Sequence, residues 1–107
     1  MHQKSFKQLR MAEAIKEILS LTLVQDVNDE LLTQITITGV QLSPDLKKAK
    51  IFYTYFKGEN QIIAQKLQKA KGFLRTCLAK KIKTKFIPDL EFVWDQYLDT
   101  IIYNQEL

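Results

Sequence analysis

The 107-residue sequence has few of the residue types on which enzymes and disulfide-stabilised proteins depend. Its only cysteine, Cys77, cannot form an internal disulfide, which suits a reducing cytoplasm. Its only histidine, His2, has no nucleophile or metal ligand at a useful spacing. The three glycines, Gly39, Gly58 and Gly72, are too far apart for a phosphate-binding loop or a dinucleotide fingerprint. We therefore expect a protein that is not an enzyme and needs no metal, cofactor or small-molecule substrate.

Long hydrophobic runs are also missing. No stretch approaches the roughly 18 consecutive apolar residues of a membrane span, and no apolar run follows the first lysines as in a signal peptide. Apolar residues make up 46% of the chain and charged residues 26%, as in ordinary globular proteins. Because no linker or change of composition divides the sequence, we expect residues 1–107 to form a single domain. We also expect the protein to be a monomer and to be cytoplasmic.

Charge is distributed unevenly along the chain. The stretch 64–86 contains no acidic residue and eight basic ones, namely Lys66, Lys69, Lys71, Arg75, Lys80, Lys81, Lys83 and Lys85. Residues 89–107, in contrast, contain five acidic residues and no basic one. Such asymmetry is typical of a protein with a polyanion-binding face and an opposite pole, although any single lysine is more simply a solvated surface residue.

The first half of the chain predicts a helix followed by two strands. Apolar residues recur at helical spacing over residues 5–24, and Ser5 is suited to cap that helix. Residues 35–43 are rich in β-branched side chains, and Gly39 marks a change of alternation that predicts a β-bulge. After a turn at residues 43–45, the stretch 49–56 is apolar on both faces, as in a central strand.

The second half predicts two helices and a third strand. The apolar stripe that begins near Ile63 is interrupted at Gly72, so we expect a break or kink there. Pro88 ends the helical pattern, residues 90–95 alternate like a strand, and residues 98–107 read as an irregular tail. A crossover of this length favours a third strand parallel to the second. The expected fold is α+β, in the order α-β-β-α-α-β, with helices on one face of a three-stranded mixed sheet.

Binding to a polyanion is the function that these observations favour. Lysines spread over helical positions suit phosphate contacts. Phe52 and Phe56 lie on the strand face opposite Tyr53 and Tyr55, so one of the two sets could be exposed for base stacking. Tyr53, Tyr55, Phe92 and Trp94 are more simply core residues, and Phe52 more simply packs across the strands, so the lysines are the better candidates. An acidic protein partner for the same basic face is the alternative. The predicted contacts are Lys71, Arg75, Lys80, Lys81, Lys83 and Lys85, with Arg10, Lys47 and Lys48 as weaker candidates.

Four groups of residues occur in the order of a known family. They are Arg10-Met11-Ala12-Glu13, then Ile37-Thr38-Gly39-Val40 with Ser43, Asp45-Leu46 and Ala49-Lys50, then Ala70-Lys71-Gly72-Phe73-Leu74-Arg75, and finally Ile87-Pro88-Asp89-Leu90-Glu91-Phe92 with Asp95. Each group alone is weak, but the ordered set is specific. The sequence resembles the ribosome-binding factor A family of bacterial small-subunit assembly factors.

The resemblance implies a type II KH-like domain in which an Ala-x-Gly kink, here Ala70 to Gly72, replaces the Gly-x-x-Gly loop that clamps single strands in ordinary KH domains. It also implies a non-enzymatic protein that binds the free small ribosomal subunit, contacts its rRNA, and supports late rRNA maturation, notably during cold adaptation.

Overall fold

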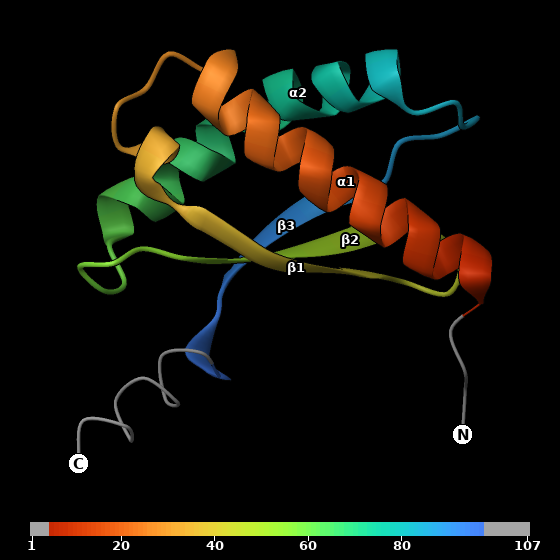
Figure 1. Ribbon diagram of the computed structural model, residues 1–107, viewed down its shortest axis with the longest axis horizontal. Coiled ribbons are helices and arrows are strands. Elements are labelled where there is room, and N and C mark those ends of the chain that lie inside the picture. Colours follow the sequence, from red (N-terminus) through yellow and green to blue (C-terminus); the bar gives the residue numbers. More distant parts are fainter. Residues whose placement is uncertain (1–4, 98–107) are drawn as a thin grey trace.

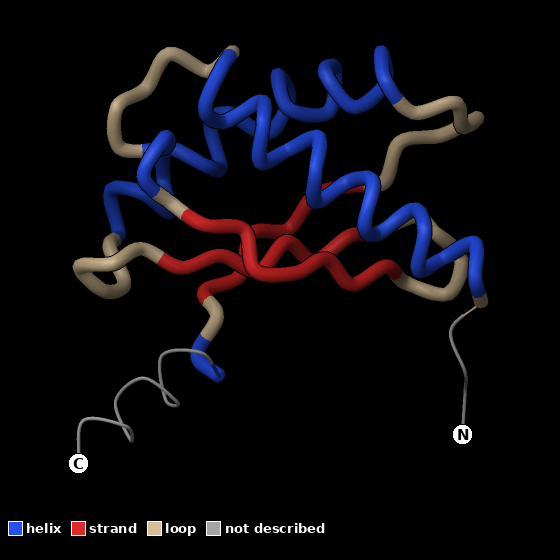
Figure 2. Tube along the Cα trace, viewed as in Figure 1, coloured by secondary structure: helices blue, strands red, loops and turns tan. Residues whose placement is uncertain are grey.

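The computed structural model describes residues 5–97, which form two helices packed on one face of a three-stranded sheet (Figure 1). Figure 2 shows the strands as one layer beneath the helical layer. The elements in order are α1 (Phe6–Gln25), the 3-10 helix η1 (Leu32–Gln34), β1 (Thr36–Leu42), β2 (Lys48–Thr54), α2 (Gln61–Lys81) and β3 (Asp89–Trp94). The α+β class and the mixed sheet are as predicted. The predicted tail, residues 98–107, lies outside the described residues.

The sheet has β2 at its centre, antiparallel to β1 and parallel to β3. The register between β1 and β2 shifts between Ile37 and Gly39, which confirms the predicted bulge. Because the bulge inserts one extra residue, Ile37, Val40 and Leu42 all pack toward the core despite their unequal spacing. The prediction that the third strand runs parallel to the second is also confirmed.

Helix α1 begins with a capping box. The Ser5 hydroxyl accepts a hydrogen bond from the Gln8 backbone N–H at 3.2 Å, and the Gln8 side chain accepts one from the Ser5 N–H at 3.0 Å. These bonds satisfy two backbone donors that a helix N-terminus otherwise leaves free. Ser5 is therefore the cap that the sequence predicted.

Helix α2 runs without interruption from Gln61 to Lys81, so the predicted division into two helices at Gly72 is wrong. A glycine inside a helix costs about 1 kcal/mol relative to alanine. Leu67 lies before Gly72, Leu74 and Leu78 lie after it, and all three are fully buried. Burying one such side chain contributes roughly 1.5–3 kcal/mol, so packing outweighs the local preference of glycine.

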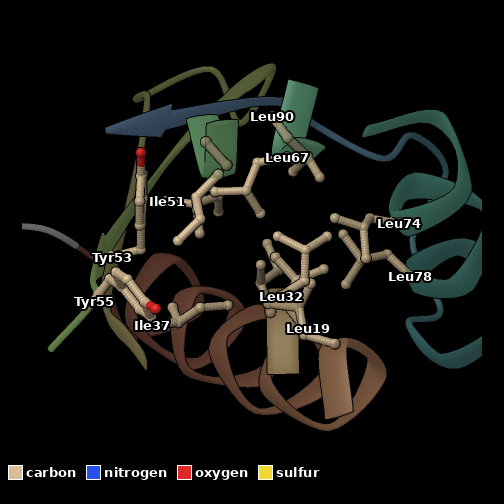
Figure 3. Packing of buried hydrophobic residues seen from close by; sticks show 14 of the residues in the cluster. Leu19, Leu32, Ile37, Ile51, Tyr53, Tyr55, Leu67, Leu74, Leu78 and Leu90 are labelled. Carbon is tan, nitrogen blue, oxygen red and sulfur yellow. The ribbon is translucent and has the colours of Figure 1, made fainter. Parts of the chain in front are cut away.

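The core lies between the two helices and the sheet (Figure 3). Tyr53 and Tyr55 are buried in it as predicted, and the Trp94 ring packs edge-on against Tyr53 with 5.6 Å between ring centroids. Phe92 and Trp94 are half-buried against the same cluster. The opposite face of the sheet is not covered by either helix (Figure 1), and Phe52 lies half-buried there.

Candidate nucleic-acid interface

The basic residues of α2 lie on two different flanks of the helix. A continuous helix rotates about 100° per residue, which places Lys66, Lys69, Phe73, Cys77 and Lys80 on one side of the buried stripe and Lys71 and Arg75 on the other. We call the first group the α1-side flank, because Lys66 pairs with Asp29 after α1, and the second the β3-side flank, because Arg75 contacts the segment before β3. The positive charge therefore does not form one uniform face.

Arg75 binds the chain's own backbone. Its Nε donates to the Pro88 carbonyl at 3.2 Å and its Nη2 donates to the Ile87 carbonyl at 3.0 Å. A guanidinium has five N–H donors, so these two bonds hold the connection between α2 and β3 and leave the others free. The predicted phosphate contact of Arg75 has only those remaining donors to use.

The C-terminal end of α2 and the connection after it carry the densest exposed positive charge. Four lysines there are exposed, and none forms an ion pair with another described residue: Lys80, Lys81, Lys83 and Lys85. Lys80 and Lys81 lie in the last turn of α2, where cations interact favourably with the helix dipole. The Lys85 ammonium lies 5.6 Å from the centroid of the exposed Phe86 ring. Ammonium groups in this setting are available to phosphates.

The three weaker candidates are Arg10 of α1, Lys47 of the turn between β1 and β2, and Lys48 at the start of β2. That turn lies near the N-terminal end of α1 (Figure 1). The Gln8 side chain donates to the Ser43 carbonyl at 3.5 Å, which places the turn containing Lys47 beside that end of the helix. The Asp89 N–H in turn donates to the Lys47 carbonyl at 2.8 Å. The Arg10 guanidinium lies 6.0 Å from the Phe6 ring centroid. Arg10 and Lys47 are both exposed at the end where β3 begins.

On the uncovered face of the sheet, charges of opposite sign stand side by side. Lys48 is level with Asp89 and Lys50 with Glu91 in the parallel register of β2 and β3. Beside them, a hollow of about 620 Å³ includes Phe52 and the carboxylates of Glu59, Glu91 and Asp95 in its lining. Local compensation of charge makes this face a poor phosphate binder, and Lys48 is accordingly a weaker candidate than the lysines after α2.

The sequence did not reveal the pairing of Lys66 with Asp29. The Lys66 Nζ lies 2.6 Å from Asp29 Oδ2, and the Asp29 carboxylate also accepts from the backbone N–H groups of Leu31 and Leu32. Chiefly the hydrogen bond from Lys66 lowers the pKa of Asp29 below its usual 3.8. These two side chains are 37 residues apart, so only the fold brings them together. Lys66 is thereby engaged in linking α2 to the loop after α1.

The sequence-based prediction also left out Lys69 and Phe73. Both are exposed on the α1-side flank with Lys80, at positions 69, 73 and 80 of one helix. Residues spaced by four and seven lie on the same side of a helix, so the sequence could have indicated this group. The inference requires a helix that continues through Gly72.

Neither a metal centre nor a membrane span is found within residues 5–97. No group of three or more histidine, cysteine, aspartate or glutamate side chains there is arranged to hold a metal ion. Neither helix of that part of the chain has the length and apolar character needed to cross a bilayer.

Comparison with known proteins identifies relatives over most of the chain. A family model described as "Ribosome-binding factor A" matches residues 7–107. Ribosome-binding factor A of Coxiella burnetii (strain Dugway 5J108-111) is 41% identical over 96 residues, which cover 89% of this chain and 81% of that protein. Ribosome-binding factor A of Francisella philomiragia is 40% identical over 99 residues, covering 92% of this chain and 67% of the relative.

Two known structures share the fold. The crystal structure of ribosome-binding factor A from Thermus thermophilus superposes with a TM-score of 0.74 at 24% identity, covering 81% of this chain and 93% of that one. A homology model of Thermus thermophilus ribosome binding factor A, as fitted into the cryo-EM map of a 30S–RbfA complex, superposes with a TM-score of 0.69 at 23% identity, covering 88% of this chain and 97% of that one. At these identities the likeness demonstrates the fold.

Proposed function

Because the chain belongs to the ribosome-binding factor A family, we propose that it binds the free small ribosomal subunit through rRNA contacts and supports late maturation of that subunit. As a member of this family it is not an enzyme, so its effect on the subunit comes from binding. We place it in the cytoplasm as a monomer and expect it to matter most during cold adaptation. The observation that carries the proposal is family membership, and the exposed lysines after Leu78 support placing the rRNA contact there.

The proposed contact surface consists of the end of α2 and the connection to β3. Lys80, Lys81, Lys83 and Lys85 neutralise rRNA phosphates and release the counterions condensed on them, which supplies affinity with little sequence selection. Arg75 supports this surface, because its two bonds to backbone carbonyls fix the connection against a rigid helix. Lys71, Arg10 and Lys47 extend the contact, and Lys48 contributes least because Asp89 stands beside it.

The fold is further proposed to be a type II KH-like domain that has lost the usual nucleic-acid clamp. The chain's three glycines do not form a Gly-x-x-Gly loop, and residues 70–72 lie inside α2 where that loop would otherwise separate two helices. In the family, an Ala-x-Gly bend occupies this place, and we assign it to Ala70 and Gly72. Without the clamp, the lysines favour structured rRNA over an extended single strand.

Charge reversal tests the contact surface directly. In the variant Lys80→Glu/Lys81→Glu/Lys83→Glu, we expect co-sedimentation with purified small subunits to be lost, because attraction to phosphate becomes repulsion. The fold should persist, since all three side chains are exposed, and circular dichroism checks this. The matched control reverses three other exposed lysines, Lys7, Lys50 and Lys57. Undiminished co-sedimentation of the first variant would refute the proposed surface.

A further inference from the structure

Phe73 is an exposed aromatic side chain among the lysines of α2. It is 47% exposed, and within residues 5–97 no other ring or cation stacks on it. Lys69 precedes it by one helical turn and Lys80 follows it by two, both on the α1-side flank. The ring therefore offers an open face with an ammonium group on either side along the helix.

A hollow lies beside this ring. It has a volume of about 370 Å³ and is lined by Asp26, Phe73, Cys77, Lys80 and Lys81. Small-molecule sites in proteins occupy about 300–1,000 Å³, so the hollow is large enough for a single small ring system. Asp26 is the C-cap residue of α1, and its carboxylate accepts no hydrogen bond from any described residue. A ring face, lysines and a free acceptor thus meet in one place.

Each of these groups matches part of a nucleotide. Bases stack on exposed aromatic rings in proteins that bind unpaired nucleic acid, and nearby lysines bind the adjoining phosphates. A carboxylate accepts hydrogen bonds from the amino group of a base, as with the N4 amino group of cytosine. An apolar peptide in the same hollow would leave the lysines and Asp26 without partners, which disfavours it.

We propose that this hollow receives one unpaired base of the bound rRNA, stacked on Phe73, with its neighbouring phosphates held by Lys69 and Lys80. This inference rests on the proposed function and adds a specific nucleotide site to it. Asp26 gives the site a preference for cytosine over uracil, because cytosine has a donating amino group at the position where uracil has the acceptor O4, which a carboxylate repels.

The test compares variants of the full chain for binding to small subunits and to the hexanucleotides rC6 and rU6. Loss of one stacked base weakens binding roughly 5- to 150-fold, so Phe73→Leu should bind rC6 and small subunits that much more weakly than the unaltered chain. Phe73→Tyr keeps the ring and should retain affinity. Phe56→Leu is the matched control, because Phe56 is 75% exposed and its ring centroid lies 5.5 Å from the Lys57 ammonium, away from the hollow.

Cys77 supplies a second measurement on the unaltered protein. It is the only cysteine of the sequence and lines the hollow, so alkylation by iodoacetamide reports directly on occupancy. We expect rC6 and small subunits to slow the reaction, and rC6 to bind several-fold more tightly than rU6. Asp26→Asn should reduce that preference, since an amide can also donate to uracil.

The outcomes separate the two proposals. If Phe73→Leu binds as tightly as the unaltered chain and Cys77 reacts at the same rate with and without RNA, the nucleotide site is wrong. The proposed function survives that result if the reversal of Lys80, Lys81 and Lys83 still abolishes subunit binding. Equal affinity for rC6 and rU6 would overturn the role of Asp26.

Discussion

At the scale of single residues, Thr22 is the polar side chain that stands out in the described core. It is fully buried on the inner face of α1, and its hydroxyl oxygen has no hydrogen-bond partner among residues 5–97. A buried hydroxyl without a partner keeps its desolvation cost, about 1–3 kcal/mol, with nothing to offset it. The position therefore favours an apolar side chain of the same shape.

Replacing Thr22 by valine should stabilise the protein. Valine keeps the β-branched shape and removes the unpaired hydroxyl, so we expect a gain of about 1 kcal/mol in the free energy of unfolding. For a chain of this size, such a gain raises the melting temperature by roughly 4–8 °C. Thermal denaturation followed by circular dichroism measures it. Thr22→Ser is the control, since it keeps the hydroxyl, loses a methyl group and should destabilise. A less stable Thr22→Val variant would contradict the account.

The site residues show what a sequence can and cannot give at this scale. The density of lysines after Leu78 is visible in the sequence, because it needs no knowledge of the fold. The two hydrogen bonds from Arg75 to backbone carbonyls cannot be read from the sequence, because they depend on where the chain returns toward β3. Likewise, Lys66 reads as a free surface charge until the fold places Asp29 beside it.

At the scale of elements, the strands were more predictable than the second helix. Alternation and β-branched residues indicated all three strands, and Gly39 indicated the bulge, because these signals are local. Helix α2 was misjudged because Gly72 was weighed alone, whereas tertiary burial of the leucines on both sides determines the outcome. That error also hid the α1-side flank. Residues before and after Gly72 can be assigned to the same side of a helix only if the helix is continuous, because each residue adds about 100° of rotation.

Gly72 can test the assigned bend without damaging the core. A Cβ added at Gly72 meets no atom within 4 Å, so Gly72→Ala should stabilise the chain by about 0.4–1 kcal/mol through its better helix propensity. If the bend at Ala70 and Gly72 contributes to binding, the same variant should bind small subunits more weakly despite its higher melting temperature. Thermal denaturation and co-sedimentation measure the two effects separately.

Gly58 provides the matched control for that substitution. A Cβ there also meets no atom within 4 Å, but Gly58 has a φ of +95°, which L side chains rarely adopt. Gly58→Ala should therefore destabilise the chain and leave binding at low temperature unchanged. A Gly72→Ala variant that melts lower than the unaltered chain would contradict the expected gain from helix propensity at an open helical position.

At the scale of the whole molecule, charge separates the helical layer from the uncovered sheet face. On α2 and the connection after it, Lys69, Lys80, Lys81, Lys83 and Lys85 are exposed and form no ion pair with a described residue. On the sheet face, by contrast, the exposed Lys48 and Lys50 stand beside Asp89 and Glu91, next to the acidic hollow. The electric field of a polyanion attracts the lysine-rich end of α2 more strongly than the charge-compensated sheet face. A protein with this charge distribution is therefore oriented before any contact forms. If rRNA binds the proposed contact surface, the sheet face points away from it.

This arrangement predicts how binding depends on salt. If Lys80, Lys81, Lys83 and Lys85 each neutralise one phosphate, the logarithm of the binding constant should fall with the logarithm of salt concentration with a slope of about −3 to −4. Titration of small subunits with the full chain at several KCl concentrations gives this slope. Lys83→Ala should make it shallower by about one, and Lys57→Ala should not change it.

The same salt titration distinguishes the contribution of base stacking from that of phosphate contacts. Phe73→Leu should lower affinity at every salt concentration with an unchanged slope, because a stacked base releases no counterions, whereas each lysine variant changes the slope itself. A slope near zero for the unaltered chain would instead contradict phosphate binding by these lysines. If the chain does not bind rRNA at low salt but captures an acidic protein, the alternative partner for the basic face is favoured. A slope that falls with Phe73→Leu would mean that this substitution displaces Lys69 or Lys80 and does not merely remove a ring.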